Sequence, residues 1–535
     1  MRFKSLMYAP KFMMQNFSMW SRVPHILAAL AAVLLLPGTV LGAIIDITTF
    51  GADGSDEIDD TVEIRAAADA LQENDILLIP ESSLYYKVTH DANLAIDEPG
   101  VHVVVRGRVL MTGTPTPSNH MFIVTADRCA FRGEGGVLEG SGSYLASTDA
   151  DDPALIRFFN ADDCSVSGLR LKNGPRFLIF LGGAERCSIR DCVFEGGPTQ
   201  LTAQNQGIFL RDSNYILIRG NRFMADAGGG QAGSWIGSAA AHAHTGISIL
   251  GNQFSGAHEH AVNCSGMSYS VIADNIVSNA LGVALRTDGS DNVIANNNIR
   301  TAAGGGIEIG NGARCVIAGN RVKDFGWVAV QAAMTGDGGG AGGVYTENLI
   351  IGNSLLAGAT NPVVHEAIRI LAPVDCSRTK ITGNLIVGAG RDDDNPAISV
   401  ASGSPSHAVS ITGNTFDQCP GDGIVIDNVN YSIVSDNVIR LTGGGIPFQS
   451  VNVTETNKVT DNLIDGTFPP LAIQSLSQAG NEATLQWNMG TGTAFSVGWT
   501  EDLDQWNDLP VGYTDTWTDT NVNGTAEKYY RVGTE

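Results

Sequence analysis

Ten asparagines between Asn221 and Asn462 each end a short run of β-branched residues, and this repeat constrains the fold more than any other feature of the chain. The runs include ILIRGN, which ends at Asn221, and VIADN, which ends at Asn275. Successive asparagines are 22 to 33 residues apart, with a recurrent step of 22 or 23. A near-constant step with occasional longer insertions is typical of stacked repeats. Val and Ile that alternate with polar residues and stop at Gly, Asn or Asp predict strands.

We therefore predict an all-β fold, a right-handed parallel β-helix (solenoid) in which each repeat forms one coil. Repeats of this length are too short for two packed helices, and the recurrent leucines of a leucine-rich repeat are missing from the sequence. Coils would stack at the inter-strand spacing of about 4.8 Å. Asparagines at the same turn of successive coils would then hydrogen bond to one another as a ladder. Their predicted role is structural.

The first 42 residues have the features of a signal peptide. Four basic residues precede the apolar run ILAALAAVLLL at 26–36, and Val40-Leu41-Gly42 offers small residues for cleavage. An uncleaved anchor is the alternative. No later apolar run approaches the 18 residues that a membrane span needs. We expect a secreted, periplasmic or cell-surface protein without a membrane span in the mature chain.

The net charge of −24 argues against a nucleic-acid partner, since phosphate binding needs clustered Lys and Arg. A polyanionic substrate would need a local basic patch or bound cations. The chain also has eight cysteines, which in an exported protein invites a disulfide interpretation. Their positions favour buried free thiols instead. Four of them begin equivalent strands, and a fifth takes a ladder position (Cys129, Cys164, Cys187, Cys315; Cys192).

Residues 44–90 open the mature chain with a strand, an Asp-rich turn and a helix that begins at Asp60-Thr61. This helix is expected to cover the core of the first coil. The segment FGADGSDEIDDTVEIRAAADAL resembles the opening motif of the pectate-lyase-like right-handed β-helix superfamily, especially its rhamnogalacturonases, polygalacturonases and alginate epimerases. Residues 137–197 resemble the coils that precede the active site of family 28 glycoside hydrolases. The resemblance covers about 44–466 and implies the fold, whereas its members include hydrolases, lyases, epimerases and non-enzymes.

The catalytic motif of family 28 is not matched. That family places Asn-Thr-Asp-Gly after the matching region, but this chain has Asn205-Gln206-Gly207, and the paired aspartates of the next coil are replaced by a glycine-rich stretch at 225–230. An inverting glycosidase needs two carboxyl groups about 6.5–9.5 Å apart. The sequence therefore argues against polygalacturonase-type hydrolysis at that position, although Asp212 and Asp226 lie nearby.

Four segments are expected: the signal peptide at 1–42, the β-helix at 43–466, a linker at 467–472 that contains Pro469-Pro470, and a small fibronectin-like β-sandwich at 473–535. Trp499 and Trp506 of the last segment are interpreted as core residues, with sugar stacking as the alternative.

The predicted site is a polar strip on one face of the β-helix. Alignment of the coils on the asparagines gives a second strand column, whose outward positions are expected to include Ala284 and Pro447 as well as polar residues. Insertions at 226–245, 334–346, 354–365 and 388–395 border the strip, as loops often border binding sites. The predicted catalytic residues are Arg286, Glu308, Arg369 and His260, and the predicted substrate-binding residues are Asn263, Gln331, Glu366 and Arg211.

Such a strip suits β-elimination on a uronate-containing polysaccharide, such as a pectin-, alginate- or sulfated-glycan-like chain. Arginine would neutralise the substrate carboxylate, and His260 or another base would remove the neighbouring proton. A polysaccharide lyase acting as a monomer is the first prediction. The alternatives are a non-catalytic glycan-binding or cell-surface protein, a diverged glycoside hydrolase, and plain exposed ion pairs in the strip.

Metal binding is weakly indicated. The HAHTG and AHEH runs contain closely spaced histidines, but zinc needs three or four convergent ligands, so loop histidines are the preferred interpretation. Calcium is the only cofactor that the sequence suggests, because some lyases of this superfamily use it and because Arg391-Asp392-Asp393-Asp394 is acidic. A solvated turn is the simpler interpretation of that run.

Overall fold

The computed structural model describes residues 42–534 except 115, 142–152, 197–205, 226–233, 239–241, 257–258, 334–344, 358–365, 373, 391–394, 443–444, 455–456, 467–472, 480–481, 488–494, 503–504, 513–515 and 520–528. The side chains of Gln206, Ala333 and residues 465–534 are also outside this description. The predicted signal peptide, apart from Gly42, and the predicted linker lie outside the described residues. No described helix is long and apolar enough to cross a membrane.

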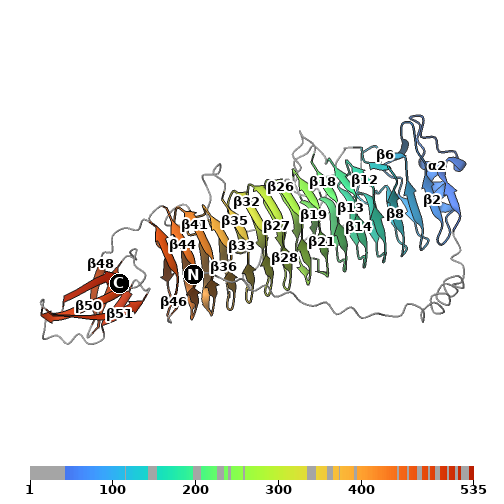
Figure 1. The fold of residues 1–535 in the computed structure, drawn as a ribbon. Helices are drawn as coiled ribbons and strands as arrows, with labels where there is room; N and C mark the ends of the chain where they lie inside the picture. Colours follow the sequence, from blue (N-terminus) through green and yellow to red (C-terminus); the bar gives the residue numbers. More distant parts are fainter. Residues whose placement is uncertain are drawn as a thin grey trace, which may run out of the picture. The chain divides into compact units, whose positions relative to one another are not determined.

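From Ile44 to Gly466 the chain winds through three parallel sheets, one strand of each per coil (Figure 1). The three sheets are called A, B and C, and their strands are given below. In a typical coil the chain forms one strand of sheet B, then one of sheet C and then one of sheet A, before the next coil begins. Because strand pairs are parallel and in register, residues one coil apart become neighbours along the axis. The predicted all-β parallel solenoid is confirmed.

Sheet A has 16 strands: β1 (Ile44–Asp46), β2 (Ile76–Ile79), β5 (His102–Val105), β8 (Ala130–Gly133), β11 (Ser165–Ser167), β14 (Ser188–Arg190), β17 (Leu217–Arg219), β21 (Ser248–Leu250), β25 (Val271–Ala273), β28 (Val293–Ala295), β31 (Val316–Ala318), β34 (Leu349–Ile351), β37 (Lys380–Thr382), β40 (Ser410–Thr412), β43 (Ile433–Ser435) and β46 (Lys458–Thr460).

Sheet B has 15 strands: β3 (Tyr86–Thr89), β6 (Arg108–Thr112), β9 (Val137–Glu139), β12 (Arg170–Lys172), β15 (Val193–Glu195), β18 (Arg222–Met224), β22 (Gln253–Ser255), β26 (Ile276–Ala280), β29 (Asn298–Ala302), β32 (Arg321–Phe325), β35 (Ser354–Leu356), β38 (Leu385–Val387), β41 (Thr415–Cys419), β44 (Val438–Leu441) and β47 (Leu463–Gly466).

Sheet C, which carries the predicted strip, has 14 strands: β4 (Leu94–Ile96), β7 (Phe122–Val124), β10 (Ala154–Phe159), β13 (Phe177–Gly182), β16 (Gln206–Arg211), β19 (Ser234–Ser238), β23 (His260–Cys264), β27 (Val283–Thr287), β30 (Gly305–Ile309), β33 (Val328–Ala333), β36 (Ile368–Ala372), β39 (Ile398–His407), β42 (Ile424–Asn430) and β45 (Phe448–Val451). A two-stranded sheet of β20 (His244–Thr245) and β24 (Met267–Ser268) lies beside this stack.

The predicted asparagine ladder is confirmed and lies at the corner between sheets A and B. In a representative step, Asn297 Oδ1 accepts hydrogen bonds from the backbone N–H of Asn275 at 3.0 Å and from Asn275 Nδ2 at 2.9 Å. Asn297 Nδ2 in turn donates to Ile272 O and to Asn320 Oδ1. Cys192 occupies the predicted ladder position, where its backbone N–H donates to Asn221 Oδ1. Buried amides thus satisfy one another from coil to coil.

The residue before each ladder asparagine has a positive φ, which explains why the motif is GN, DN or NN. Examples are Gly319 at +63°, Asp274 at +58° and Asn296 at +56°. Gly, Asp and Asn are the residues that enter the left-handed region most easily. Sequence and turn geometry therefore agree at this corner.

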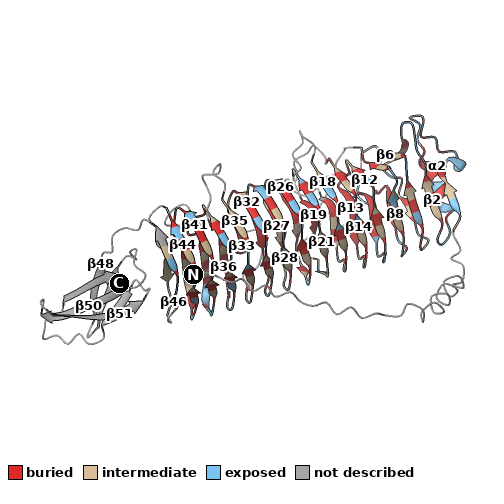
Figure 2. Cartoon of the chain, viewed as in Figure 1, coloured by how far each residue is buried: buried red, intermediate tan, exposed pale blue. Residues whose placement is uncertain are grey.

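The interior is a continuous column of buried aliphatic, aromatic and cysteine side chains. Figure 2 shows buried residues on the strands along the solenoid. All eight cysteines are buried and free, as predicted. Burial raises the pKa of Cys192, Cys264 and Cys419 to about 12, so these thiols stay protonated. They act as small apolar residues.

The predicted N-terminal helix is α2 (Thr61–Asp69), which buries Ile64, Ala67 and Ala68 against the first coils (Figure 1). The 3₁₀ helix η1 (Ile47–Phe50) precedes it. Asp60 takes the N-cap position but makes no capping hydrogen bond. Its carboxylate accepts from the backbone N–H groups of Asp53 and Lys87 and so joins the turn to β3.

The segment after residue 472 forms two three-stranded antiparallel sheets. One contains β48 (Ile473–Ala479), β49 (Glu482–Trp487) and β52 (Thr516–Asp519); the other contains β51 (Gln505–Gly512), β50 (Phe495–Asp502) and β53 (Tyr529–Thr534). The fibronectin-like sandwich and the segment boundaries stay predictions, and the side chains of Trp499 and Trp506 lie outside the described part of the chain.

The ladder predicts a large stability difference between two adjacent asparagines. Asn297→Ala would leave the buried N–H of Asn275 and the carbonyl of Ile272 without this partner, so we expect a loss of about 3 kcal/mol in the free energy of unfolding. Asn298→Ala, on the neighbouring half-buried position, should cost less than about 0.5 kcal/mol. Urea unfolding followed by far-UV circular dichroism measures both. Equal losses would contradict a dominant role for the ladder.

Candidate functional site

The strand register of sheet C defines one outward-facing column on its central coils. Glu308 lies between the core residues Ile307 and Ile309, so its side chain points away from the interior. The register corrects two of the expected outward positions. In β27 the outward residue is Arg286 and not Ala284, which is buried. In β45 it is Gln449 and not Pro447. From β23 to β36 the column contains Asn263, Arg286, Glu308, Gln331 and Arg369.

Arg286 and Glu308 form the central contact of this column. They are directly paired across β27 and β30, and Arg286 Nε lies 3.3 Å from Glu308 Oε1. Their side chains are only 15% and 3% exposed, respectively. This is a nearly buried ion pair on the outer face of a sheet, not an exposed one. Its charges are weakly screened by solvent and salt.

A second ion pair and an aromatic ring lie toward the C-terminal coils. Arg369 Nε is 3.8 Å from Glu366 Oε1, and the guanidinium of Arg369 lies over the ring of Trp327, 5.6 Å from its centroid. Glu366 is buried, and its Oε2 has no hydrogen-bond partner among the described atoms. Gln331 lies between the two ion pairs and is also buried. Trp327 was not part of the predicted strip.

The eight predicted residues all lie on strands of sheet C or at their ends, but they do not form one cluster. Arg211 ends β16, three strands before Arg286 in sheet C, and contacts Asp212 at 4.0 Å. His260 begins β23, and Glu366 precedes β36, four strands further along the sheet. The Nδ1–H of His260 donates to Val283 O at 2.7 Å. Only the stretch from Asn263 to Arg369 is contiguous, and the roles assigned to these residues stay predictions.

Asp288 is an acidic residue of this region that the sequence analysis missed. It follows β27, where Thr287 pairs with Ile309, so Asp288 is beside Gly310. Asp288 Oδ1 occupies the space that a Cβ of Gly310 would fill. That oxygen is buried without a hydrogen-bond partner among the described atoms, while Oδ2 accepts from Ser265 Oγ at 3.0 Å. The absence of a side chain at 310 thus allows the Asp288 carboxylate to reach the coil that carries Glu308.

Tyr345 closes the corner next to these acids. Its buried hydroxyl donates a hydrogen bond to Gly310 O. Burial, and then the negative charges of Asp288 and Glu308, raise the pKa of Tyr345 well above its usual value. The hydroxyl therefore stays protonated and holds Gly310 in place. Tyr345 lies in an insertion that is longer than the regular coil, so the spacing of the repeat does not predict its hydrogen bond to Gly310.

Gly310 directly follows β30 and is two residues from Glu308, a backbone distance of about 7 Å when extended. The Asp288 carboxylate, which lies at Gly310, and the carboxylate of Glu308 are therefore expected at a separation of that order. This is within the range for an inverting glycosidase, in which a water molecule must fit between the acid–base pair and the sugar.

The histidine runs do not converge on a metal in the described part of the chain. His242 Nδ1 pairs with Asp212 at 3.1 Å, whereas His244 is buried and contacts the backbone of Ser213. Among the described residues no group of three His, Cys, Asp or Glu side chains is placed to bind a metal ion. His258 and the run Arg391–Asp394, with its expected calcium, lie outside the described residues, as do most of the bordering insertions.

Comparisons with known proteins agree with this architecture. Residues 177–355 match a family model described as a right-handed β-helix region. No curated protein sequence matches. A tailspike protein of E. coli bacteriophage HK620, a mutant in complex with a pentasaccharide, is similar in structure: the TM-score is 0.52 at 12% identity, over 91% of this chain and 92% of the tailspike.

Two other solved structures are more distant. The Streptococcus pneumoniae surface adhesin PfbA aligns at a TM-score of 0.43 and 14% identity, over 79% of this chain and 100% of the adhesin. A Thermotoga maritima exopolygalacturonase aligns at 0.41 and 12% identity, over 79% of this chain and 91% of the enzyme.

The stacked coils and the matched model define the class of protein: the chain is a right-handed parallel β-helix protein. Its fold is the one implied by the resemblance to the pectate-lyase-like superfamily, and the residues that match the family model, 177–355, lie in the middle of the chain.

The buried ion pair predicts an asymmetric response to mutation. Arg286→Ala removes the cation beside a buried carboxylate, so we expect a loss of about 3–5 kcal/mol in the free energy of unfolding. The double variant Arg286→Ala/Glu308→Gln should recover much of this loss, because the neutral amide is easier to bury. The exposed pair of Arg314 and Asp291 is the control, and Arg314→Ala should cost less than about 1 kcal/mol. Denaturant unfolding of the four proteins tests the pair; an Arg286→Ala loss no larger than that of Arg314→Ala would contradict it.

Proposed function

We propose that the protein is exported, binds a polysaccharide along the outer face of sheet C and hydrolyses it with Asp288 and Glu308. The observation that carries this proposal is the convergence of these two carboxyl groups beside Gly310 and Arg286. Of the alternatives open at the sequence level, it is the diverged glycoside hydrolase, with its acids at a different place from the family 28 motif.

The two acids have different surroundings, which suggests their roles. Arg286 holds Glu308 as a carboxylate, the form in which a general base accepts a proton from water. Asp288, with one buried oxygen free of hydrogen-bond donors among the described atoms, would give its proton to the glycosidic oxygen. Water oxygen bonds to the anomeric carbon as the bond to the leaving oxygen breaks, and the water proton passes to Glu308.

The charge balance of the strip favours a neutral glycan over a uronate. Arg286 is compensated by Glu308 and Arg369 by Glu366, so neither arginine carries an uncompensated positive charge. β-Elimination requires a cation that neutralises the substrate carboxylate, and such a cation must not already be paired with a carboxylate of the protein. The half-buried ring of Trp327, with Arg369 over it, adds an apolar group but no uncompensated charge to this face.

Two further observations bear on the glycan partner. The tailspike with the same fold is in complex with a pentasaccharide, which supports an oligosaccharide or polysaccharide as the partner. In the present chain His260 begins β23, with Nδ1 2.7 Å from Val283 O and Nε2 3.9 Å from Glu259 Oε1, and this histidine is the observation that favours the lyase as a second candidate.

The hydrolase predicts that both acids are needed and that no unsaturated product forms. Purified residues 43–535 would be incubated with neutral polysaccharides, pectin, alginate and sulfated glycans, and both reducing ends and the ultraviolet absorbance of unsaturated uronates would be followed. We expect reducing ends alone. Asp288→Asn and Glu308→Gln should each lower the rate at least about a hundredfold.

Asp274→Asn is the matched control, since Asp274 is exposed at the ladder corner and Asn is equally suited to its positive φ. Thermal unfolding of each variant verifies the fold. Absorbance that rises with the reducing ends and depends on His260 would establish the lyase instead. Binding without any cleavage would establish a non-catalytic glycan-binding protein.

The position of Asp288 predicts an effect of Gly310 on catalysis. The methyl group of Gly310→Ala would displace the Asp288 carboxylate, the movable end of a side chain, so activity should fall at least about tenfold while stability changes by about 1 kcal/mol or less. Because the displaced group is the proton donor, kcat should fall more than KM rises. Gly352→Ala is the control for an added methyl group that meets open space. Because the φ of Gly352 is +64°, this variant is itself destabilised, so its kcat and not its stability is compared. Unchanged kcat in Gly310→Ala would argue against Asp288 as the acid.

A further inference from the structure

The corner between sheets C and A contains a second column of residues in the left-handed conformation. Each lies two residues before a strand of sheet A, and the in-register pairing of those strands makes the column continuous. From the coil of β14 to that of β43 its members are Arg186, Tyr215, Gly246, Tyr269, Asp291, Arg314, Glu347, Arg378, Ala408 and Tyr431, with φ between 51° and 70°.

This column differs from the ladder corner in the residues it uses. At the ladder corner the left-handed position is filled with Gly, Asp or Asn, the residues that this conformation suits. At the C–A corner the same strained conformation is imposed on Tyr, Arg and Glu. A bulky residue kept at positive φ where Gly or Asn would fit better indicates a requirement other than folding.

Tyr215 and Tyr269 illustrate this requirement most clearly. They are 58% and 66% exposed, so they contribute little to the core. Single exposed apolar residues are common and need no explanation. These two rings, however, occur two coils apart on one edge, which places them about 10 Å apart along the axis.

The residue between them keeps the edge open. A Cβ at Gly246 would lie 2.6 Å from Cδ1 of Tyr215, so the ring of Tyr215 lies over Gly246 along the edge. No side chain therefore stands between the two tyrosines on this column. The result is an aromatic shelf, which we define as Tyr215, Gly246 and Tyr269.

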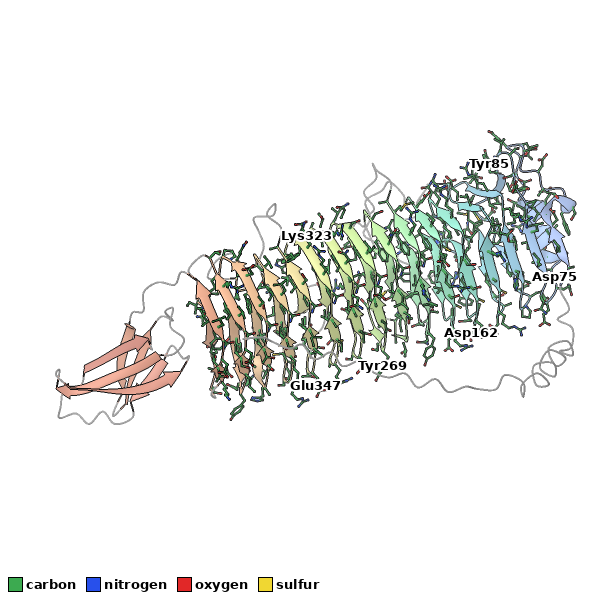
Figure 3. The ribbon with its side chains drawn as sticks, viewed as in Figure 1. Asp75, Tyr85, Asp162, Tyr269, Lys323 and Glu347 are labelled. Carbon is green, nitrogen blue, oxygen red and sulfur yellow. The ribbon has the colours of Figure 1, made fainter. Side chains whose placement is uncertain are left out.

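Hydrogen-bonding groups continue from the shelf along the same edge. Arg314 and, less strongly, the hydroxyl of Tyr269 donate to Asp291 and hold the pKa of that carboxyl below its usual value. Arg314 pairs with Asp291 at 2.7 Å, and Arg378 pairs with Glu347 at 2.7 Å. Figure 3 shows Tyr269 and Glu347 on one long edge of the solenoid, opposite Lys323. The charges beside the shelf therefore neutralise one another in pairs.

We propose that the aromatic shelf is a glycan-binding site, separate from the carboxylate pair, that takes an extended polysaccharide chain lying along the corner. Sugar rings have apolar C–H faces that pack on aromatic rings, while their hydroxyl groups bond to a polar rim. A pyranose unit in an extended chain advances by a distance comparable with one coil, so alternate sugars would meet Tyr215 and Tyr269. The mutually neutralised rim favours an uncharged chain. The site does not depend on whether Asp288 and Glu308 cleave the glycan.

Affinity electrophoresis of the full chain tests the shelf, in gels cast with hydroxyethylcellulose, xylan, galactomannan, dextran, pectin or alginate. At least one neutral polysaccharide should retard the protein, and Tyr215→Asn/Tyr269→Asn should raise Kd at least about tenfold. Tyr431→Asn is the matched control, because Tyr431 has the same turn conformation and is 56% exposed but has no exposed tyrosine two coils away. It should bind as the original chain does.

Thermal unfolding distinguishes a binding role from a structural one. Since Asn suits positive φ better than Tyr, the double variant should unfold at the same temperature or a higher one. A lower midpoint than that of Tyr431→Asn would show that the tyrosines stabilise the fold, and would overturn the proposal. So would unchanged binding by the double variant, or no retardation in any of the gels. The double variant also separates the two sites: neither tyrosine belongs to the carboxylate pair, so its rate of cleavage of a short oligosaccharide should equal that of the original chain.

Discussion

The hydrogen bonds between buried asparagine amides fix the arrangement of the whole β-helix. Each ladder side chain accepts from the backbone N–H of the previous coil and donates to the next amide, so no coil can satisfy its own corner alone. A slip of one residue would leave several buried polar groups without partners, at about 1–3 kcal/mol each. The ladder therefore locks the register of sheets A and B, and through the short connections it also locks sheet C.

A fixed register determines which side chains meet on the outer face. Arg286 and Glu308 are 22 residues apart in the chain but directly paired in space, because the coil that separates them has that length. The same stacking places Asp288 next to Gly310 and allows its carboxylate to cross to the next coil. Longer coils change only the bordering segments, as between Asn320 and Asn353, where the ladder continues across 33 residues. The scaffold thus tolerates insertions without moving the column.

The repeat made the fold predictable, because a ladder asparagine must be buried and its preceding residue must accept a positive φ. These two demands appear in the sequence as GN, DN and NN after a β-branched run. The outward column of sheet C was harder to predict from the sequence. Counting from the asparagines gave Ala284 as the outward residue, two positions before the correct one, Arg286. The count fails there because the connection from the ladder to sheet C varies in length. Asp288 and Tyr345 could not be found in this way, because their contacts depend on an absent side chain at Gly310 and on an insertion.

The two left-handed corners offer a way to separate structural from functional residues within one repeat. Both impose the same backbone conformation on every coil, so the free energy that favours Gly, Asp or Asn is the same at each. The ladder corner follows this preference, which indicates that only the fold acts on it. The C–A corner departs from it at Tyr215, Tyr269, Tyr431 and the charged residues between them. The charged members form ion pairs within the chain, so the departure that a bound glycan would account for is that of the exposed rings of Tyr215 and Tyr269.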